Sequence, residues 1–157
     1  MNTFTHHDGP LGRLLLTSRG RGLSGVYFAD HRAPTPALAD YTEDSAGFDD
    51  ARRALDACFA GEVPDEVVLD MSGTDFQRRV WAALRRIPRG RTRSYGELAR
   101  ELGKPTAARA IGAANARNPV SILVPCHRVI GADGALTGYA GGEARKRWLL
   151  EVEGALQ

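Results

Sequence analysis

Hydrophobic positions along the first part of the chain have a period of two. Leu14 and Leu16 fall on one face of an extended segment, and a less regular alternation begins at Leu23. Glycine-containing turns separate these stretches. The pattern predicts a small antiparallel meander over residues 3–28. Prolines and acidic residues follow, so we expect a loop over residues 29–45.

Helical spacing replaces this alternation from residue 47 onward. Phe48, Leu55 and Cys58 share one face of a predicted helix over residues 47–60, which places Cys58 in the core. The apolar run at residues 67–69 predicts a short strand.

Two capping boxes mark the starts of further helices. Thr74 with Gln77, and Ser94 with Glu97, have the spacing at which the two side chains satisfy the backbone N–H groups of a first helical turn. The first box predicts a helix that Pro88 ends.

The second box predicts a helix to about Leu102, and a third helix is expected from Pro105 to about Ala116. Two short helices joined by residues 103–105 predict a helix-turn-helix. A final helix is expected over residues 143–153.

These elements predict an α+β protein with an N-terminal scaffold domain at residues 1–73 and a mainly helical domain at residues 74–157. The 157 residues, 43% hydrophobic and 25% charged, are ordinary for a globular protein. No apolar run approaches the ~18 residues of a membrane span, and no secretion signal is visible. Two cysteines without C-x-x-C spacing exclude a disulfide framework and indicate a reducing cytoplasm.

Charge is distributed unevenly, although the net charge is only +2. Residues 1–73 carry 6 basic and 12 acidic side chains, whereas residues 74–157 carry 15 and 7. Residues 74–117 alone hold 11 basic and 3 acidic side chains. This asymmetry indicates a half that binds a polyanion, with a solvated, arginine-rich helical surface as the alternative.

The predicted third helix carries one long cation among small side chains. Arg109, Gly112, Ala113 and Ala116 share a face by their spacing. A helix that reads major-groove sequence needs several Arg, Asn or Gln side chains. A smooth face with one arginine favours sequence-tolerant DNA contact with base extrusion. Close packing between helices is the alternative explanation for the small residues.

The pair Cys126-His127 follows the apolar residues 122–124, which predict a buried strand. A thiol beside an imidazole is typical of an activated cysteine, because the thiolate is the nucleophile and a nearby base raises its fraction. A buried apolar cysteine beside a surface histidine is the alternative.

The sequence Pro125-Cys126-His127-Arg128-Val129 is the centre of a family resemblance. Further matching segments are residues 76–81, 87–90, 94–99, 107–110, 118–119, 122–124, 138–142, 148–150 and 153–154. Together they resemble the O6-alkylguanine–DNA alkyltransferases, also called methylated-DNA–protein-cysteine methyltransferases. The N-terminal half resembles the family's variable ribonuclease-H-like domain, with weaker motifs.

The resemblance implies catalytic roles for four residues. Cys126 would accept the alkyl group, and His127 would draw off its proton through a water. Glu153 would orient His127 and stabilise its charge, and Asn118 would brace the site, while also serving as a turn residue before Pro119. A thioether at Cys126 is not readily reversed, so each molecule should act once.

The resemblance also implies substrate and DNA contacts. Tyr95 would act at the flipped guanine, Tyr139 and the glycines after Ala140 would wall the pocket, and the backbone of Val129 would contact the guanine edge. Ala140 stands where some relatives have serine, so only its backbone N–H is left to bind substrate. Arg109 would fill the gap left by the flipped nucleotide. Further DNA-binding positions implied are Ser94, Ala108 and Gly112.

The expected partner is therefore double-stranded DNA that contains O6-alkylguanine, bound by a monomer, with cooperative binding left open. No cofactor and no metal are expected, because His6, His7 and His31 lack the thiolate partners of a zinc site. Three alternatives remain: a DNA-binding relative without catalysis, a Cys–His hydrolase, and a helix-turn-helix regulator. Cys126 argues against the first, and the alanine-rich third helix against the last.

Overall fold

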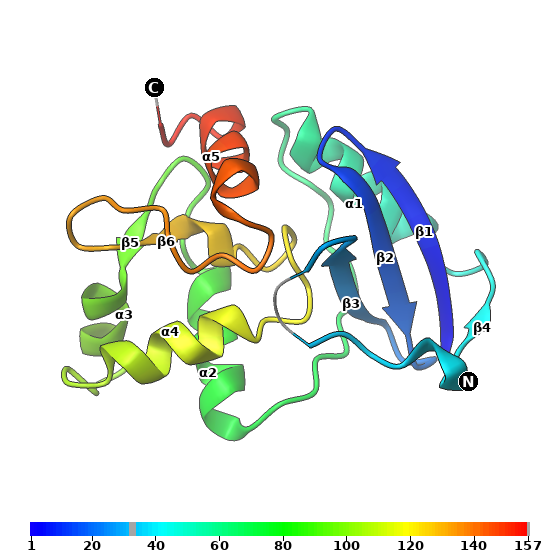
Figure 1. The fold of residues 1–157 in the computed structure, drawn as a ribbon, viewed down its shortest axis with the longest axis horizontal. Helices are drawn as coiled ribbons and strands as arrows, with labels where there is room; N and C mark the ends of the chain where they lie inside the picture. Colours follow the sequence, from blue (N-terminus) through cyan, green and yellow to red (C-terminus); the bar gives the residue numbers. More distant parts are fainter. Residues whose placement is uncertain (32–33, 157) are drawn as a thin grey trace.

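The computed structural model describes residues 1–31 and 34–156 and shows an α+β protein with two lobes (Figure 1). The N-terminal lobe contains the main sheet and helix α1, and the helical lobe contains α2 to α5. In Figure 1 the helix α5 lies beside both lobes. The expected α+β class is confirmed.

The predicted meander forms the main sheet. Its strands are β1 (Thr3–Gly9), β2 (Gly12–Ser18) and β3 (Leu23–Phe28), paired antiparallel. Leu14, Leu16 and Val26 are fully buried, because the period-two pattern turns one face of the sheet to the core.

The segment expected to be a loop contains two short elements. A 3₁₀ turn η1 (Leu38–Asp40) leads into β4 (Thr42–Glu43), which pairs parallel with the free edge of β1. The sheet order is therefore β3-β2-β1-β4. A strand of two residues is too short to leave a periodic signal, so the sequence pattern missed it.

Helix α1 (Asp49–Phe59) packs Phe48, Ala51 and Leu55 into the core, as predicted. Cys58 packs against this core but stays half-buried.

The strand predicted at residues 67–69 is wrong. Leu69 makes a single bridge to Leu23, and Val68 is 74% exposed. Both backbone hydrogen bonds of this bridge, from the Leu23 N–H to the Val68 carbonyl and from the Asp70 N–H to the Leu23 carbonyl, involve the first residue of β3, so no ladder forms.

Four helices build the second lobe: α2 (Asp75–Arg85), α3 (Tyr95–Glu101), α4 (Ala108–Ala116) and α5 (Glu143–Val152). Both capping boxes are confirmed. The Thr74 hydroxyl accepts from the Gln77 backbone N–H at 3.1 Å, and the Ser94 hydroxyl accepts from that of Glu97 at 3.1 Å.

Helix α4 begins at Ala108, later than predicted, because Pro105 lies in a turn that precedes it. Its inner face buries Ile111 and Ala114. The Trp81 indole Nε1–H of α2 donates to the Ala114 carbonyl at 2.9 Å, which fixes α4 against α2. None of the helices in the described ranges is long and apolar enough to cross a membrane.

The buried strand predicted before Cys126 does not form. Residues 121–124 make turns, and Ile122 has a φ of 74°, in the left-handed region that no strand uses. The Asn118 side chain organises this turn: its Nδ2 donates to the carbonyls of Val124 and Val120, and its Oδ1 accepts from the Val120 N–H. Side-chain hydrogen bonds have here replaced a strand ladder.

Candidate active site

Cys126 is the first residue of a 3₁₀ turn, η2 (Cys126–Arg128), and it is 3% exposed. The chain continues into β6 (Val129–Ile130), which pairs parallel with β5 (Arg93–Ser94) just before α3. Cys126 and His127 therefore lie in a tight turn and not in an extended chain. The turn is short and buried, so few atoms of it can move independently.

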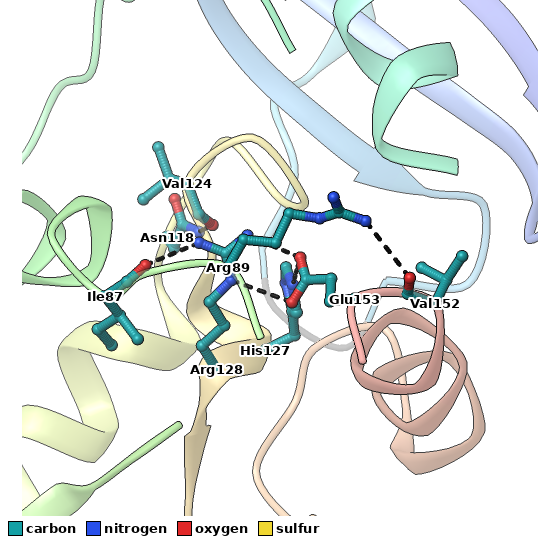
Figure 2. Close-up of polar contacts among 8 residues, drawn as sticks. All are labelled: Ile87, Arg89, Asn118, Val124, His127, Arg128, Val152 and Glu153. Atoms are coloured by element: carbon teal, nitrogen blue, oxygen red, sulfur yellow. Dashed lines mark hydrogen bonds and ion pairs between the residues drawn. The ribbon is translucent and has the colours of Figure 1, made fainter. Parts of the chain in front are cut away.

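His127, Arg128 and Glu153 form one buried polar cluster (Figure 2). His127 Nε2 lies 2.9 Å from Glu153 Oε2, and the Arg128 guanidinium donates to both Glu153 oxygens at 2.7 and 3.0 Å. Arg128 also donates to the Ile87 carbonyl at 2.8 Å. The side chains of His127 and Glu153 are 1% and 7% exposed. A bidentate guanidinium holds the carboxylate in one orientation.

Glu153 follows the last turn of α5 as its C-cap residue. Arg89 donates to the neighbouring Val152 carbonyl at 3.3 Å, so a cation faces this helix end (Figure 2). Two arginines thus fix the end of α5 near His127.

The cluster sets the charge of each member. Burial opposes ionisation of Glu153, but the hydrogen bonds from His127 and Arg128 outweigh it and lower its pKa to about 2. Burial lowers the pKa of His127, against the opposing effect of Glu153, so the imidazole is neutral at pH 7. An ionised Glu153 can only accept, so His127 carries its proton on Nε2. Nδ1 is then a bare, buried acceptor, with no partner among the described residues.

Cys126 is held as a thiol in the free protein. Burial raises its pKa to about 11, although a hydrogen bond from Asn118 and the charge of Lys146 act in the opposite direction. Attack on an alkyl group therefore requires a base. His127 lies next to Cys126 in the chain and has one unprotonated ring nitrogen.

Two buried side chains hold the backbone around Cys126. Asn115, on the inner face of α4, donates from Nδ2 to the Cys126 carbonyl at 3.3 Å. Lys146, fully buried in α5, donates to the Val129 carbonyl and, at 3.3 Å, to the Thr137 carbonyl. Burial lowers the pKa of Lys146 to about 8, against the opposing effect of Glu143 and of Cys126 when it is ionised.

Tyr95 connects α3 and α4 to the loop that precedes α5. Its hydroxyl lies 3.4 Å from the Thr137 carbonyl, and a Cβ on Gly138 would lie 2.9 Å from that hydroxyl. A Cβ on Gly112 would lie 3.7 Å from the Tyr95 ring, so the ring lies against α4. The structure thus brings Tyr95 and Gly112 into contact. The sequence analysis did not predict this contact.

The same loop carries Tyr139 and Ala140. Tyr139 is buried, and its ring centroid lies 6.4 Å from that of His127, edge to face. Its hydroxyl is buried with no hydrogen-bond partner in the described part of the chain. Ala140 is half-buried beside it. The loop therefore brings Tyr139 to the site, whereas Ala140 has no contact that identifies a role.

The expected DNA-binding residues lie on or next to α3 and α4. Arg109 is exposed in the first turn of α4, and no described residue pairs with it. Ala108 is half-buried beside it. Ser94 uses its hydroxyl to cap α3, so its side chain already has a structural partner.

Sequence reasoning missed three residues that the structure brings to the site: Asn115, Arg128 and Lys146. Arg128 belongs to the matched motif, and its charge beside His127 was an available signal. Lys146 lies in a charged run that is typical of a helix surface. Asn115 is three positions before Asn118, and nothing in the pattern separates it from a helix-end residue.

The described residues contain no group of three or more His, Cys, Asp or Glu side chains that could hold a metal ion.

Comparison with known proteins identifies the family. The family described as "6-O-methylguanine DNA methyltransferase, DNA binding domain" matches residues 75–155. The methylated-DNA–protein-cysteine methyltransferase of Mycobacterium tuberculosis is 52% identical over 147 residues, which cover 93% of this chain and 88% of the relative. That of Methanosarcina acetivorans is 47% identical over 149 residues, which cover 94% and 96%.

Solved structures agree with the sequence comparison. The crystal structure of Mycobacterium tuberculosis OGT in complex with DNA matches with a TM-score of 0.90 and 50% identity, covering 96% of this chain and 92% of that one. An archaeal O6-methylguanine-DNA methyltransferase from Pyrococcus kodakaraensis shares the fold at a TM-score of 0.66 and 24% identity. Cys126, His127 and Glu153 thus lie together in a fold shared along nearly the whole chain, and this protein belongs to the methylated-DNA–protein-cysteine methyltransferase family.

Proposed function

We propose that this protein repairs DNA by transferring the alkyl group of O6-alkylguanine to its own Cys126. The observation that carries this proposal is the neutral, buried His127, whose Nε2–H is bound by Glu153 and whose Nδ1 is unprotonated. That arrangement supplies a base beside a thiol that burial keeps protonated.

The proposed transfer is a nucleophilic substitution at the alkyl carbon. The Cys126 proton passes to His127 Nδ1 through one water, and the Sγ lone pair forms a bond to the alkyl carbon as the bond from that carbon to guanine O6 breaks. Guanine leaves as an anion that hydrogen bonds from the Tyr95 hydroxyl or a backbone N–H would stabilise, and it then takes a proton from the Tyr95 hydroxyl or from water. Glu153 and Arg128 hold the imidazolium that forms in place.

The product explains why the protein acts once. A thioether at Cys126 has no good leaving group, and no described side chain near it could cleave a carbon–sulfur bond. Each molecule is therefore consumed by one transfer.

DNA is proposed to dock on the helical lobe. Residues 74–117 carry 11 basic and 3 acidic side chains, and their turn between α3 and α4 is our candidate helix-turn-helix. Arg109 would occupy the gap left by the flipped nucleotide, with Ala108 and Gly112 allowing close approach. Ser94 would contact DNA through its backbone, because its hydroxyl caps α3.

The remaining proposals concern the domain boundary, the pocket contacts and the cellular compartment. We place the domain boundary at residues 73 and 74, with a ribonuclease-H-like N-terminal domain, because α2 begins with the Thr74 cap. In the pocket, Tyr139 and the backbone of Val129 and Ala140 would contact the base. A reducing cytoplasm would keep the acceptor, one of two free cysteines, in its thiol form.

The test is a single incubation with a duplex that contains one O6-methylguanine. Peptide mass spectrometry should find one methyl per molecule, on Cys126, with Cys58 as the internal control. Cys126→Ser should keep its affinity for the duplex and lose transfer. A methyl on Cys58, or more than one turnover per molecule, would show that the proposed chemistry is wrong.

A further inference from the structure

Arg145 joins the two lobes beside the candidate pocket. It lies in the first turn of α5, and its side chain is 22% exposed. Its Nε–H donates to the Leu11 carbonyl at 3.0 Å, in the turn between β1 and β2, and its Nη1–H donates to the Gly141 carbonyl at 3.2 Å. It also forms an ion pair with Asp30, and its guanidinium lies 4.7 Å from the centre of the Phe28 ring.

Phe28, which packs against the Arg145 guanidinium, also packs against the loop that carries Tyr139. Phe28 is the last residue of β3 and is 2% exposed. Its ring centroid lies 6.0 Å from that of Tyr139 at an angle of 68°. A Cβ on Gly141 would lie 2.5 Å from the Phe28 ring, so the ring fills the space beside the loop backbone.

Three side chains therefore hold this loop. Tyr95 approaches the Thr137 carbonyl from α3, Lys146 reaches the same carbonyl from α5, and Arg145, also on α5, holds the Gly141 carbonyl while it contacts the N-terminal lobe. Only the last of these depends on residues from the first 30 positions of the chain. A guanidinium suits this role, since its planar fork donates in several directions while its face packs on an aromatic ring.

We propose that Arg145, packed on Phe28, is a positioning residue through which the N-terminal lobe sets the pocket wall at Tyr139 and Gly141. This inference rests on the proposed alkyl transfer. It assigns the N-terminal lobe a part in the reaction, although Cys126 and His127 lie in the other lobe.

The expected effect of losing the contact is kinetic. Arg145→Met keeps an apolar stem over Phe28 but removes the donors to Leu11 and Gly141. A wall displaced by a fraction of an ångström to about 1 Å costs roughly 10- to 100-fold in rate. The affinity for duplex DNA should stay unchanged, because the proposed docking surface lies on α3 and α4.

The experiment compares Arg145→Met with Arg147→Met in the full-length protein. Arg147 is exposed on the same helix and has no partner among the described residues, so its replacement removes the same charge without touching the loop. Single-turnover rates at saturating O6-methylguanine duplex, and duplex dissociation constants, are measured well below the unfolding midpoint of each variant. Arg145→Met should lose rate and keep affinity, and Arg147→Met should match the wild type.

A double-mutant cycle with Phe28→Leu separates positioning from general loss of stability. If Arg145 and Phe28 both act by positioning the pocket wall at Tyr139 and Gly141, the transfer rate of the double variant should be only slightly lower than that of Arg145→Met alone. Fully additive losses, equal losses in Arg147→Met, or a loss in DNA affinity alone would each overturn the inference. A wild-type protein that leaves Cys126 unmethylated in the same assay would instead refute the proposed function.

Discussion

Replacing Glu153 by glutamine should remove a pH-dependent contribution to stability. The carboxylate accepts from His127 and twice from Arg128, at 2.7 to 3.0 Å, inside a cluster that is almost closed to solvent. Glutamine keeps the shape of the side chain but loses the charge, and its amide N–H would face the Arg128 guanidinium.

The magnitude follows from the pKa of Glu153. Its ordinary value of 4.5 falls to about 2 in the folded protein, because the hydrogen bonds from His127 and Arg128 outweigh the effect of burial. At 1.36 kcal/mol per pH unit, this difference is worth about 3 kcal/mol. Breaking a buried ion pair costs ~3–5 kcal/mol, which agrees with that figure.

The direction of the pH dependence follows because the pKa of Glu153 is lower in the folded protein than in the unfolded chain. The stabilisation is fully present above pH 4.5 and is lost as the pH falls toward 2. About 1.4 kcal/mol of it should disappear between pH 6 and pH 3.5.

Urea unfolding of the wild type and Glu153→Gln at several pH values measures this directly. The difference in unfolding free energy should be about 3 kcal/mol at pH 6 and should shrink to roughly half that at pH 3.5. Glu151→Gln, an exposed position on the same helix, is the matched control and should change little. A difference between wild type and Glu153→Gln that does not vary with pH would refute the reasoning.

Three further predictions address docking, the acceptor and a helix start. Arg109→Ala should slow transfer from duplex DNA about tenfold or more and leave reaction with free O6-benzylguanine nearly unchanged, because only the duplex has a gap to fill; equal losses would remove this role. Burial raises the pKa of Cys126 to about 11, so its alkylation by iodoacetamide in the free protein should rise about tenfold per pH unit from pH 7 to pH 10; a plateau near pH 7 would contradict this. Thr74→Ala should lower the unfolding free energy by about 1 kcal/mol through loss of the capping box, whereas Thr74→Ser should not, as thermal unfolding will show.

Local signals predicted the local structure well. The two capping boxes begin α2 and α3 where expected, since the side chains and backbone groups involved are three residues apart. The meander also formed, because one fully buried face imposes a period of two.

Features that depend on distant parts of the chain were not predictable. Lys146 has the sequence context of a surface lysine, yet tertiary packing buries it between two backbone carbonyls. The apolar residues before Cys126 suggested a strand, but Asn118 bonds to that backbone and turns it through Ile122. The strand β4 exists only because the β1 edge is available to pair with it.

The position of Glu153 along the chain has a consequence for newly made protein. Cys126 and His127 leave the ribosome before Glu153, which lies 26 residues after His127 and is placed by the docking of α5. Until that helix docks, His127 has neither its carboxylate partner nor a fixed orientation. The Cys126–His127 pair can therefore carry out the proposed transfer only once α5 has docked against the rest of the fold.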